Sequence, residues 1–203
     1  MTRNNPYLIG LTGGIACGKS NLSSALISAG ATVIDADEIS RALTQPGGKA
    51  LPAIRAAFGG KVFKGPDLDR QKLARHVFSD PEALKRLNAI THPLIFEEME
   101  RQVRQHQDEP ALVLDVPLLF ETGMDKRCDE IWCASAPRET QVARLIHRGL
   151  SEKEALRRIA SQMPGEEKAR RSKHVILTTG TKEESAAQAV ALWQDVLRRL
   201  SLV

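Results

Sequence analysis

A lysine and a serine follow a glycine-rich stretch near the start of the chain, and this set of residue types can hold phosphate groups. The stretch is Gly13, Gly14, Ile15, Ala16, Cys17, Gly18, Lys19 and Ser20. Glycines let the backbone approach an anion closely, Lys19 supplies a compact positive charge, and Ser20 offers a hydroxyl to Mg²⁺. The apolar run Tyr7–Leu11 precedes the stretch and helical spacing follows it, as a phosphate-binding loop requires. The sequence therefore predicts a nucleotide-binding protein rather than a glycine-rich turn that only starts a helix.

Acidic residues end two further apolar runs and could assist phosphoryl transfer. Asp35 and Asp37 close the run that begins at Thr32, and Asp115 closes the run Ala111–Leu114. Parallel sheets bind ligands beyond the carboxyl ends of their strands, so we expect these carboxylates near the phosphate loop. In a local strand Asp35 and Asp37 would share one face. The alternatives are that Asp35 or Asp37 caps the following helix and that Asp115 starts a turn.

Five apolar runs alternate with helical segments, which indicates an α/β fold with a mostly parallel sheet. The runs are Tyr7–Leu11, Thr32–Asp35, Ala111–Asp115, Glu130–Ala134 and His174–Leu177. The helix after the phosphate loop is expected to end at Gly30, since glycine suits a left-handed C-cap. The last helix should begin with a capping box from Thr181 to Glu184 and bury Trp193 in the core.

Two segments interrupt this alternation and read as insertions. Between Ile39 and His106 the pattern gives several short helical pieces with no convincing strand, separated by glycine and proline pairs. From about Pro137 to Arg171 a second insertion carries the capping box Ser151–Glu154 and a helix with one apolar stripe. We therefore expect a helical subdomain and a smaller helical addition beside the sheet.

Composition favours a small anionic substrate. The 203 residues include 29 Lys and Arg against 25 Asp and Glu, a mild excess of +4, and the aromatic content of 4% gives no platform for stacking nucleic-acid bases. Three cysteines without metal-site spacing read as reduced thiols. No stretch reaches the roughly 20 apolar residues of a membrane span, and the first residues lack the apolar core of a signal peptide. A cytoplasmic protein that binds neither nucleic acid nor membrane is expected.

Four further strings, together with the phosphate loop, resemble the dephospho-coenzyme A kinase family. They are Val33–Asp37 (VIDAD), Leu87–Pro93 (LNAITHP), Asp115–Glu121 (DVPLLFE) and Arg158–Pro164 (RIASQMP). The resemblance runs from Leu11 to about Gly180. It implies ATP-dependent phosphorylation of the ribose 3′-hydroxyl of dephospho-coenzyme A, the final step of coenzyme A synthesis. It also implies the three-layer fold of P-loop kinases with a five-stranded parallel sheet.

The resemblance also implies a division of the chain. Residues 1–38, 107–136 and 172–203 would form the nucleotide-binding core, residues 39–106 a helical coenzyme A-binding subdomain, and residues 137–171 a lid. The implied partner is the small molecule dephospho-coenzyme A. A monomer or a weak homo-oligomer is expected.

Individual site residues follow from the same resemblance. Asp37 would accept the proton of the 3′-hydroxyl, while Lys19 and Arg144 act on the transferred phosphoryl group. Residues expected to bind ATP are Gly13, Gly14, Ala16, Cys17, Gly18, Lys19, Ser20, Asn21, Arg144 and Arg148. Residues expected to bind dephospho-coenzyme A are Asp37, Arg41, Asp69, Arg70, Asn88, His92, Pro117 and Leu118. Ser20 and Asp115 are the expected Mg²⁺ ligands.

Several of these roles have alternatives. Arg144 and Arg148 lie four apart, so they would share one helical face, which could also be merely solvated. His92 precedes Pro93 and reads as a helix-start histidine rather than a base. Five apolar residues of the insertion could line a substrate pocket, but we favour a role in the core of the subdomain. They are Leu43, Phe58, Phe78, Leu87 and Ile90.

The chain departs from the family pattern at a few positions. Cys17 stands where serine is usual and Asn21 where threonine is usual. Cys17 lies beside Lys19 and a helix N-terminus, which could favour its thiolate, although an inert small side chain is the alternative. The family tends to have asparagine near Thr178, so the preference for adenine is less constrained than phosphate binding. Rival functions are a kinase for another small alcohol, a nucleotide-dependent switch and a nucleic-acid binder.

Overall fold

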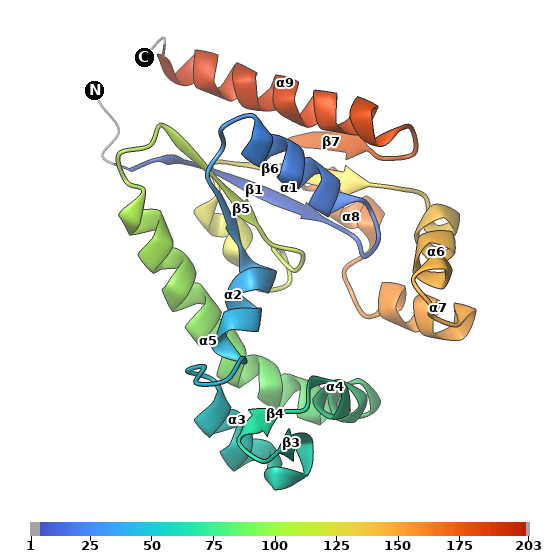
Figure 1. Cartoon of the computed structure of the whole chain (residues 1–203). Coiled ribbons are helices and arrows are strands. Elements are labelled where there is room, and N and C mark those ends of the chain that lie inside the picture. Colours follow the sequence, from blue (N-terminus) through green and yellow to red (C-terminus); the bar gives the residue numbers. More distant parts are fainter. Residues whose placement is uncertain (1–4, 202–203) are drawn as a thin grey trace. The chain divides into compact units, whose positions relative to one another are not determined.

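Figure 1 shows a computed structural model of the chain, which describes residues 5–201. The chain forms two compact units. The first consists of Met1–Ile34 and His106–Val203, and the second of Asp35–Gln105. The functional division of the chain into a nucleotide-binding core, a coenzyme A-binding subdomain and a lid stays a prediction.

A five-stranded sheet forms the centre of the first unit. Its order is β2 (Val33–Asp35), β5 (Ala111–Asp115), β1 (Tyr7–Gly13), β6 (Glu130–Ser135) and β7 (His174–Leu177). The strand pairs β1–β5, β1–β6 and β6–β7 are parallel, and the predicted strands and fold class are confirmed. Leu11 of β1 pairs with Asp115 of β5, so Asp115 lies at the sheet edge where the phosphate loop begins.

Helices cover both faces of this sheet (Figure 1). On one face α1 (Lys19–Ser28) and α9 (Lys182–Ser201) pack together, and on the other lies the short α8 (Gly165–Arg170). Trp193 of α9 is buried in one apolar cluster with Leu11 and Leu22, which confirms its predicted place in the core. As expected, Gly30 takes a positive φ of 86° directly after α1.

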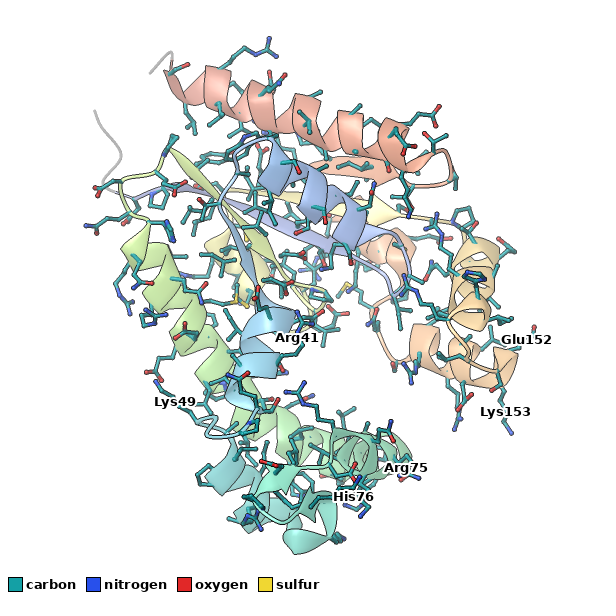
Figure 2. All side chains as sticks on the ribbon, viewed as in Figure 1. Arg41, Lys49, Arg75, His76, Glu152 and Lys153 are labelled. Atoms are coloured by element: carbon teal, nitrogen blue, oxygen red, sulfur yellow. The ribbon has the colours of Figure 1, made fainter. Side chains whose placement is uncertain are left out.

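Two further helices of this unit pack against the phosphate loop. They are α6 (Arg138–His147) and α7 (Glu152–Ala160), and the predicted capping box of Ser151 and Glu154 is present at the start of α7. Figure 2 labels Glu152 and Lys153 in the first turn of α7. Fully buried Ala155 and buried Leu145 form an apolar cluster with Ala16 of the loop. The unit also contains a 3₁₀ turn, η2 (Met124–Arg127).

The second unit is mainly helical, as predicted. Its helices are α2 (Ala36–Leu43), α3 (Leu51–Phe58), α4 (Arg70–Ser79) and α5 (Pro81–Gln105), with a 3₁₀ turn η1 (Gly60–Val62). The sequence did not predict the small antiparallel pair β3 (Phe63–Lys64) and β4 (Asp67–Leu68). Strands of two residues are too short to show an alternating pattern.

Helix α5 runs through His92 and Pro93, so the prediction of a helix start at His92 is wrong. An interior proline removes one backbone hydrogen bond, but this helix is held by packing on both sides of it. Thr91 before Pro93 and Met99 after it are both buried. The hydroxyl of Thr91 also donates to the carbonyl of Leu87, 3.0 Å away.

Aromatic and aliphatic residues form the core of the second unit. Phe58 is buried and contacts His76, which Figure 2 labels, edge to face with 5.9 Å between the ring centroids. Leu43 is buried as well, whereas Leu87 and Ile90 are half-buried. Burial of Leu43 and Phe58 agrees with the core role that we favoured. The Phe78 side chain lies outside the described part of the structure.

Candidate active site

The phosphate loop joins the end of β1 to the start of α1. Gly13 is required there, because a Cβ at this position would lie 2.6 Å from the carbonyl oxygen of Ala134. Gly18 is the N-cap residue of α1 and has a φ of 78°. Within the described structure, no side-chain hydrogen bond caps this end of the helix. Uncapped N–H groups at a helix N-terminus attract anions through both hydrogen bonding and the helix dipole. The loop therefore has the form of a phosphate site.

Side-chain hydrogen bonds from Arg144 and Thr178 hold the outer part of this loop. Ala16 takes a left-handed φ of 59°, which costs an alanine roughly 1–2 kcal/mol. Its carbonyl oxygen accepts from Nη1 of Arg144 at 3.0 Å. Arg144 also donates to Oγ1 and O of Thr178, at 3.1 and 2.5 Å, and Thr178 Oγ1 donates to the carbonyl of Cys17 at 2.8 Å. Arg144 and Thr178 together fix the backbone of the loop.

Two glutamines complete the surroundings of the loop. The backbone N–H of Ile15 donates to Oε1 of Gln162 at 3.0 Å. Oε1 of Gln141 lies 3.3 Å from where a Cβ on Gly14 would be, and its amide nitrogen donates to the carbonyl of Ala136 at 2.9 Å. Gln141, Gln162 and Thr178 had no predicted role in holding the loop. Gln162 lies inside the string Arg158–Pro164, and Thr178 was noted only as a departure from the family pattern.

Lys19 forms an ion pair with Asp115 beside the loop. Their side chains are only 13% and 3% exposed, so each charge needs the other in this low-dielectric place. Within residues 5–201 no group of three or more histidine, cysteine and acidic side chains could hold a metal. Ser20 is exposed at the start of α1. A hydroxyl and one carboxylate suit Mg²⁺, which is usually held by one or two protein oxygens plus substrate phosphates.

The loop after β5 is held by buried polar contacts. The carbonyl of Pro117 accepts from Oγ1 of Thr12 at 3.1 Å and from Nζ of Lys168 at 2.6 Å. The carbonyl of Leu118 accepts from the hydroxyl of Thr122 at 2.8 Å. Pro117 and Leu118 were predicted to bind substrate, and their side chains are half-buried.

Two further predicted ATP ligands are Arg148 and Asn21. Arg148 is not in the last turn of α6 with Arg144 but caps the end of that helix, and it is exposed. The Nδ2 of Asn21 donates to the carbonyl of Lys182 at 2.8 Å and to Oγ of Ser185 at 3.2 Å. Asn21 therefore ties α1 to α9 in this structure.

Of the two interpretations of Cys17, burial supports the inert side chain rather than the thiolate. Cys17 is 2% exposed, and burial raises the pKa of its thiol above the ordinary value despite two backbone hydrogen bonds and nearby cations. Burial likewise raises the pKa of Cys128 to about 12 and of Cys133 to about 11. All three cysteines are free, as predicted.

In the second unit Asp35 serves as the N-cap of α2. Its Oδ1 accepts the backbone N–H groups of Asp37 at 2.7 Å and Glu38 at 3.1 Å. The chain turns helical at Ala36, so the expectation that Asp35 and Asp37 share a strand face is wrong. Asp37 is exposed in the first turn of α2, and its role as the base remains a prediction.

In the second unit, only some of the predicted coenzyme-binding residues lie close to one another. Nη2 of Arg70 donates to the carbonyl of Arg41 at 2.8 Å, and the side chain of Arg41 is exposed (Figure 2). Asp69 caps α4 by accepting the N–H of Lys72 at 3.1 Å, which lowers the pKa of its carboxyl. Farther along the chain, Asn88 and His92 lie one turn apart on α5, and burial lowers the pKa of His92.

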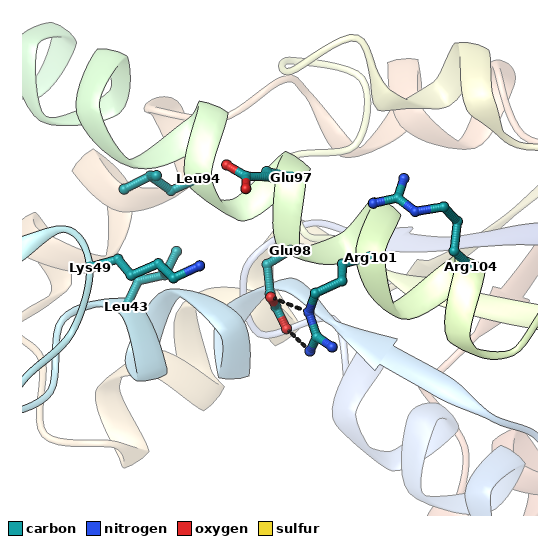
Figure 3. A pocket seen from close by; sticks show the side chains of 7 residues that line it. All are labelled: Leu43, Lys49, Leu94, Glu97, Glu98, Arg101 and Arg104. Atoms are coloured by element: carbon teal, nitrogen blue, oxygen red, sulfur yellow. Dashed lines mark hydrogen bonds and ion pairs between the residues drawn. The ribbon is translucent and has the colours of Figure 1, made fainter.

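A cavity of about 150 Å³ lies in the second unit (Figure 3). Its lining residues are Leu43, Lys49, Leu94, Glu97, Glu98, Arg101 and Arg104. Nε and Nη2 of Arg101 donate to the two oxygens of Glu98, at 2.8 and 2.5 Å. These bonds, with one from Gln102, lower the pKa of Glu98 to about 2. Apart from the candidate wall residue Leu43, no predicted site residue lines this cavity.

Comparison with known proteins identifies the family. The family model described as dephospho-CoA kinase matches residues 7–184. The chain belongs to the dephospho-CoA kinase family. The dephospho-CoA kinase of Symbiobacterium thermophilum is 49% identical over 192 residues, which cover 92% of this chain and 80% of that relative. The dephospho-CoA kinase of Geobacter metallireducens is 46% identical over 197 residues, covering 95% and 98%.

Solved structures support the same fold. TT1252 from Thermus thermophilus matches with a TM-score of 0.82 and 37% identity, covering 94% of this chain and 97% of that one. The dephospho-CoA kinase from Campylobacter jejuni matches with a TM-score of 0.65 and 25% identity over the same shares. The part of the chain that the structure describes contains no helix with the length and apolar content of a membrane span.

Proposed function

We propose that this chain transfers the γ-phosphoryl group of ATP to the ribose 3′-hydroxyl of dephospho-CoA, the reaction of its family. The observation that carries the proposal is the uncapped N-terminus of α1 with the Lys19–Asp115 ion pair beside it. Main-chain donors there can bind the phosphate tail, and Lys19 can neutralise charge on the transferred oxygens. Ser20 and Asp115 would hold Mg²⁺, which would add further positive charge at the phosphates.

Asp37 is the proposed base. The 3′-oxygen attacks the γ-phosphorus, its proton passes to the Asp37 carboxylate, and the bond to the bridging oxygen breaks to release ADP. Exposure of Asp37 in the first turn of α2, with its carboxylate not used as the helix cap, supports this role. Asp35 takes the capping role instead.

The remaining predicted residues complete the proposal. Arg144 would act from its place on the loop backbone, and exposed Arg148 would add a second guanidinium to the phosphates. For the acceptor, we infer contacts to Arg41, Asp69, Arg70, Asn88, His92, Pro117 and Leu118. A cytoplasmic enzyme that is a monomer or weak homo-oligomer is also inferred, and size-exclusion chromatography with light scattering tests the latter.

An ADP-release assay with several acceptors tests the function. Dephospho-CoA should be phosphorylated rapidly, whereas pantetheine phosphates, nucleosides and gluconate should not. Asp37→Asn should lower kcat by roughly 10²–10⁴-fold, the usual contribution of a general base, and leave ATP binding unchanged. Glu38→Gln, the neighbouring acid on the same exposed turn, should keep wild-type turnover. Rapid phosphorylation of another acceptor, or full activity of Asp37→Asn, would contradict the proposal.

A further inference from the structure

Lys168 is a fully buried lysine whose charge nothing in the proposed mechanism uses. It lies on α8 with 0% of its side chain exposed. A buried ammonium is costly unless hydrogen bonds and an opposite charge compensate it. Its Nζ donates to the carbonyl of Pro117 at 2.6 Å and lies 2.9 Å from Oε1 of Glu121. Both partners belong to the loop after β5.

This loop carries Asp115, the partner of Lys19. Pro117 lies two residues after Asp115, and its carbonyl also accepts from the fully buried hydroxyl of Thr12. Thr12 in turn lies in β1 just before the phosphate loop. Lys168 and Thr12 therefore both donate a hydrogen bond to the carbonyl oxygen of Pro117. Movement of this carbonyl would shift the strand end that presents Asp115 to Lys19.

Glu121 extends the network to the turn between α7 and α8. The same Oε1 that faces Lys168 accepts the backbone N–H of Met163 at 2.9 Å. The neighbouring Gln162 accepts the N–H of Ile15 in the phosphate loop. One short turn therefore bonds to the phosphate loop through Gln162 and to the Asp115 loop through Glu121. Lys168 supplies the positive charge that holds Glu121 there.

The charge of Lys168 also reaches the phosphate loop. Burial raises the pKa of the Cys17 thiol, and the positive charges of Arg144 and Lys168 oppose that rise. Glu121 is 24% exposed, so solvent weakens its compensation of Lys168. Lys168 therefore adds positive potential at Cys17 of the phosphate loop.

We propose that Lys168 is a positioning residue for phosphoryl transfer, which fixes the Asp115 loop and the Gln162 turn against the phosphate loop through Pro117 and Glu121. It touches no substrate atom and acts through Asp115 and Lys19. The inference rests on the proposed function. Misplacement of catalytic groups by about 1 Å can cost about 10²-fold in rate. We therefore expect the loss of Lys168 to lower kcat.

The test compares Lys168→Met with Lys173→Met in the full chain. Lys173 also pairs with a buried carboxylate, Glu130, at 2.6 Å, but on the far end of β6 from the phosphate loop. Both variants should lower the melting temperature. Only Lys168→Met should lower kcat, by roughly 10–100-fold, with the calorimetric Kd for ATP changed less than about threefold. Equal kcat values for the two variants, or an equal loss in kcat and ATP binding, would overturn the proposal.

Glu121→Gln keeps the test decisive if Lys168→Met does not fold. Glu121 is partly exposed, and glutamine preserves the acceptor for Met163 while it removes the charge that faces Lys168. Turnover should fall roughly 3–10-fold, and wild-type turnover would overturn the proposal. Wild-type enzyme that does not phosphorylate dephospho-CoA would instead refute the proposed function, so the two failures are distinguishable.

Discussion

At the scale of single residues, the site depends on how its buried charges are paired. Lys19 and Asp115 neutralise each other at the edge of the sheet, so the loop does not hold an isolated buried ammonium. A bound triphosphate would offer Lys19 new anionic partners and leave the Asp115 carboxylate able to orient Mg²⁺ and its water. Phosphate binding can therefore exchange one ion pair of Lys19 for another.

Asp115→Asn tests this view of the ion pair. The amide keeps the size of the side chain but removes the charge, so kcat should fall by roughly 10²-fold or more and the Mg²⁺ concentration for half-maximal activity should rise. Magnesium titrations of ADP release measure both effects. The matched control is Asp125→Asn, which removes an ion pair with Arg171 elsewhere in the same unit and should leave both values unchanged. An unchanged magnesium dependence of Asp115→Asn would contradict the metal role.

Sequence reasoning at this scale succeeded where residue type and spacing define the chemistry. Gly13, Gly18 and Lys19 occupy the loop as predicted, because the motif itself encodes the backbone turn and the charge. For Cys17 the residue types left a thiolate and an inert side chain both open, and burial in the folded chain, which outweighs the nearby positive charges, supports the inert one. Contacts such as Thr178 with Cys17 join residues 161 positions apart, and no local pattern reveals them.

At the scale of helices and strands, continuous apolar runs made the five strands predictable, since strands buried between helices need apolar side chains on both faces. The start of α2 was harder to predict. Asp35 ends β2 and caps α2, so one residue closes a strand and opens a helix without an intervening turn. Proline usually predicts the end of a helix, but in α5 the packing of buried side chains keeps the chain helical through Pro93.

The cap of α9 provides a prediction at this scale. Oγ1 of Thr181 accepts the N–H of Glu184 at 3.1 Å, and Glu184 accepts the N–H of Thr181 at 2.8 Å. Thr181→Ala should lower the free energy of unfolding by about 0.5–2 kcal/mol, the usual worth of an N-cap, without changing kcat. Urea unfolding measures the loss. Gln188→Ala, an exposed change within the same helix, should cost almost nothing, and an equal loss in both variants would contradict the capping role.

At the scale of the whole molecule, the first unit separates its catalytic edge from a charged cluster at the opposite ends of its strands. Glu130 begins β6 and is fully buried there. Its carboxylate accepts from the hydroxyl of Tyr7 at 2.9 Å, Nε1 of Trp132 at 2.8 Å, Lys173 at 2.6 Å and Arg199 at 3.1 Å. These donors join β1, β6, the start of β7 and α9. The cluster can therefore set the stability of the unit without contacting the phosphate loop.

The pH dependence of stability follows from the Glu130 cluster. Burial alone would raise the pKa of Glu130, but the four hydrogen-bond donors outweigh it and lower the pKa to about 2. A carboxyl with a lowered folded-state pKa stabilises the protein above its unfolded value of 4.5, and that contribution is lost as pH falls towards 2. Glu130→Gln should therefore cost about 2–3 kcal/mol at pH 7 and progressively less below pH 4.5.

Urea unfolding of both proteins between pH 3 and pH 7, with ADP release at pH 7, measures this dependence. The gap between wild type and Glu130→Gln should narrow on acidification, because wild type loses the carboxylate interactions that the variant already lacks. Asp195→Asn is the control, since its half-exposed ion pair with Arg199 should contribute less than about 1 kcal/mol. A gap that stays constant with pH would show that packing, rather than ionisation, explains the loss. A fall in kcat would show that the two ends of the strands are coupled.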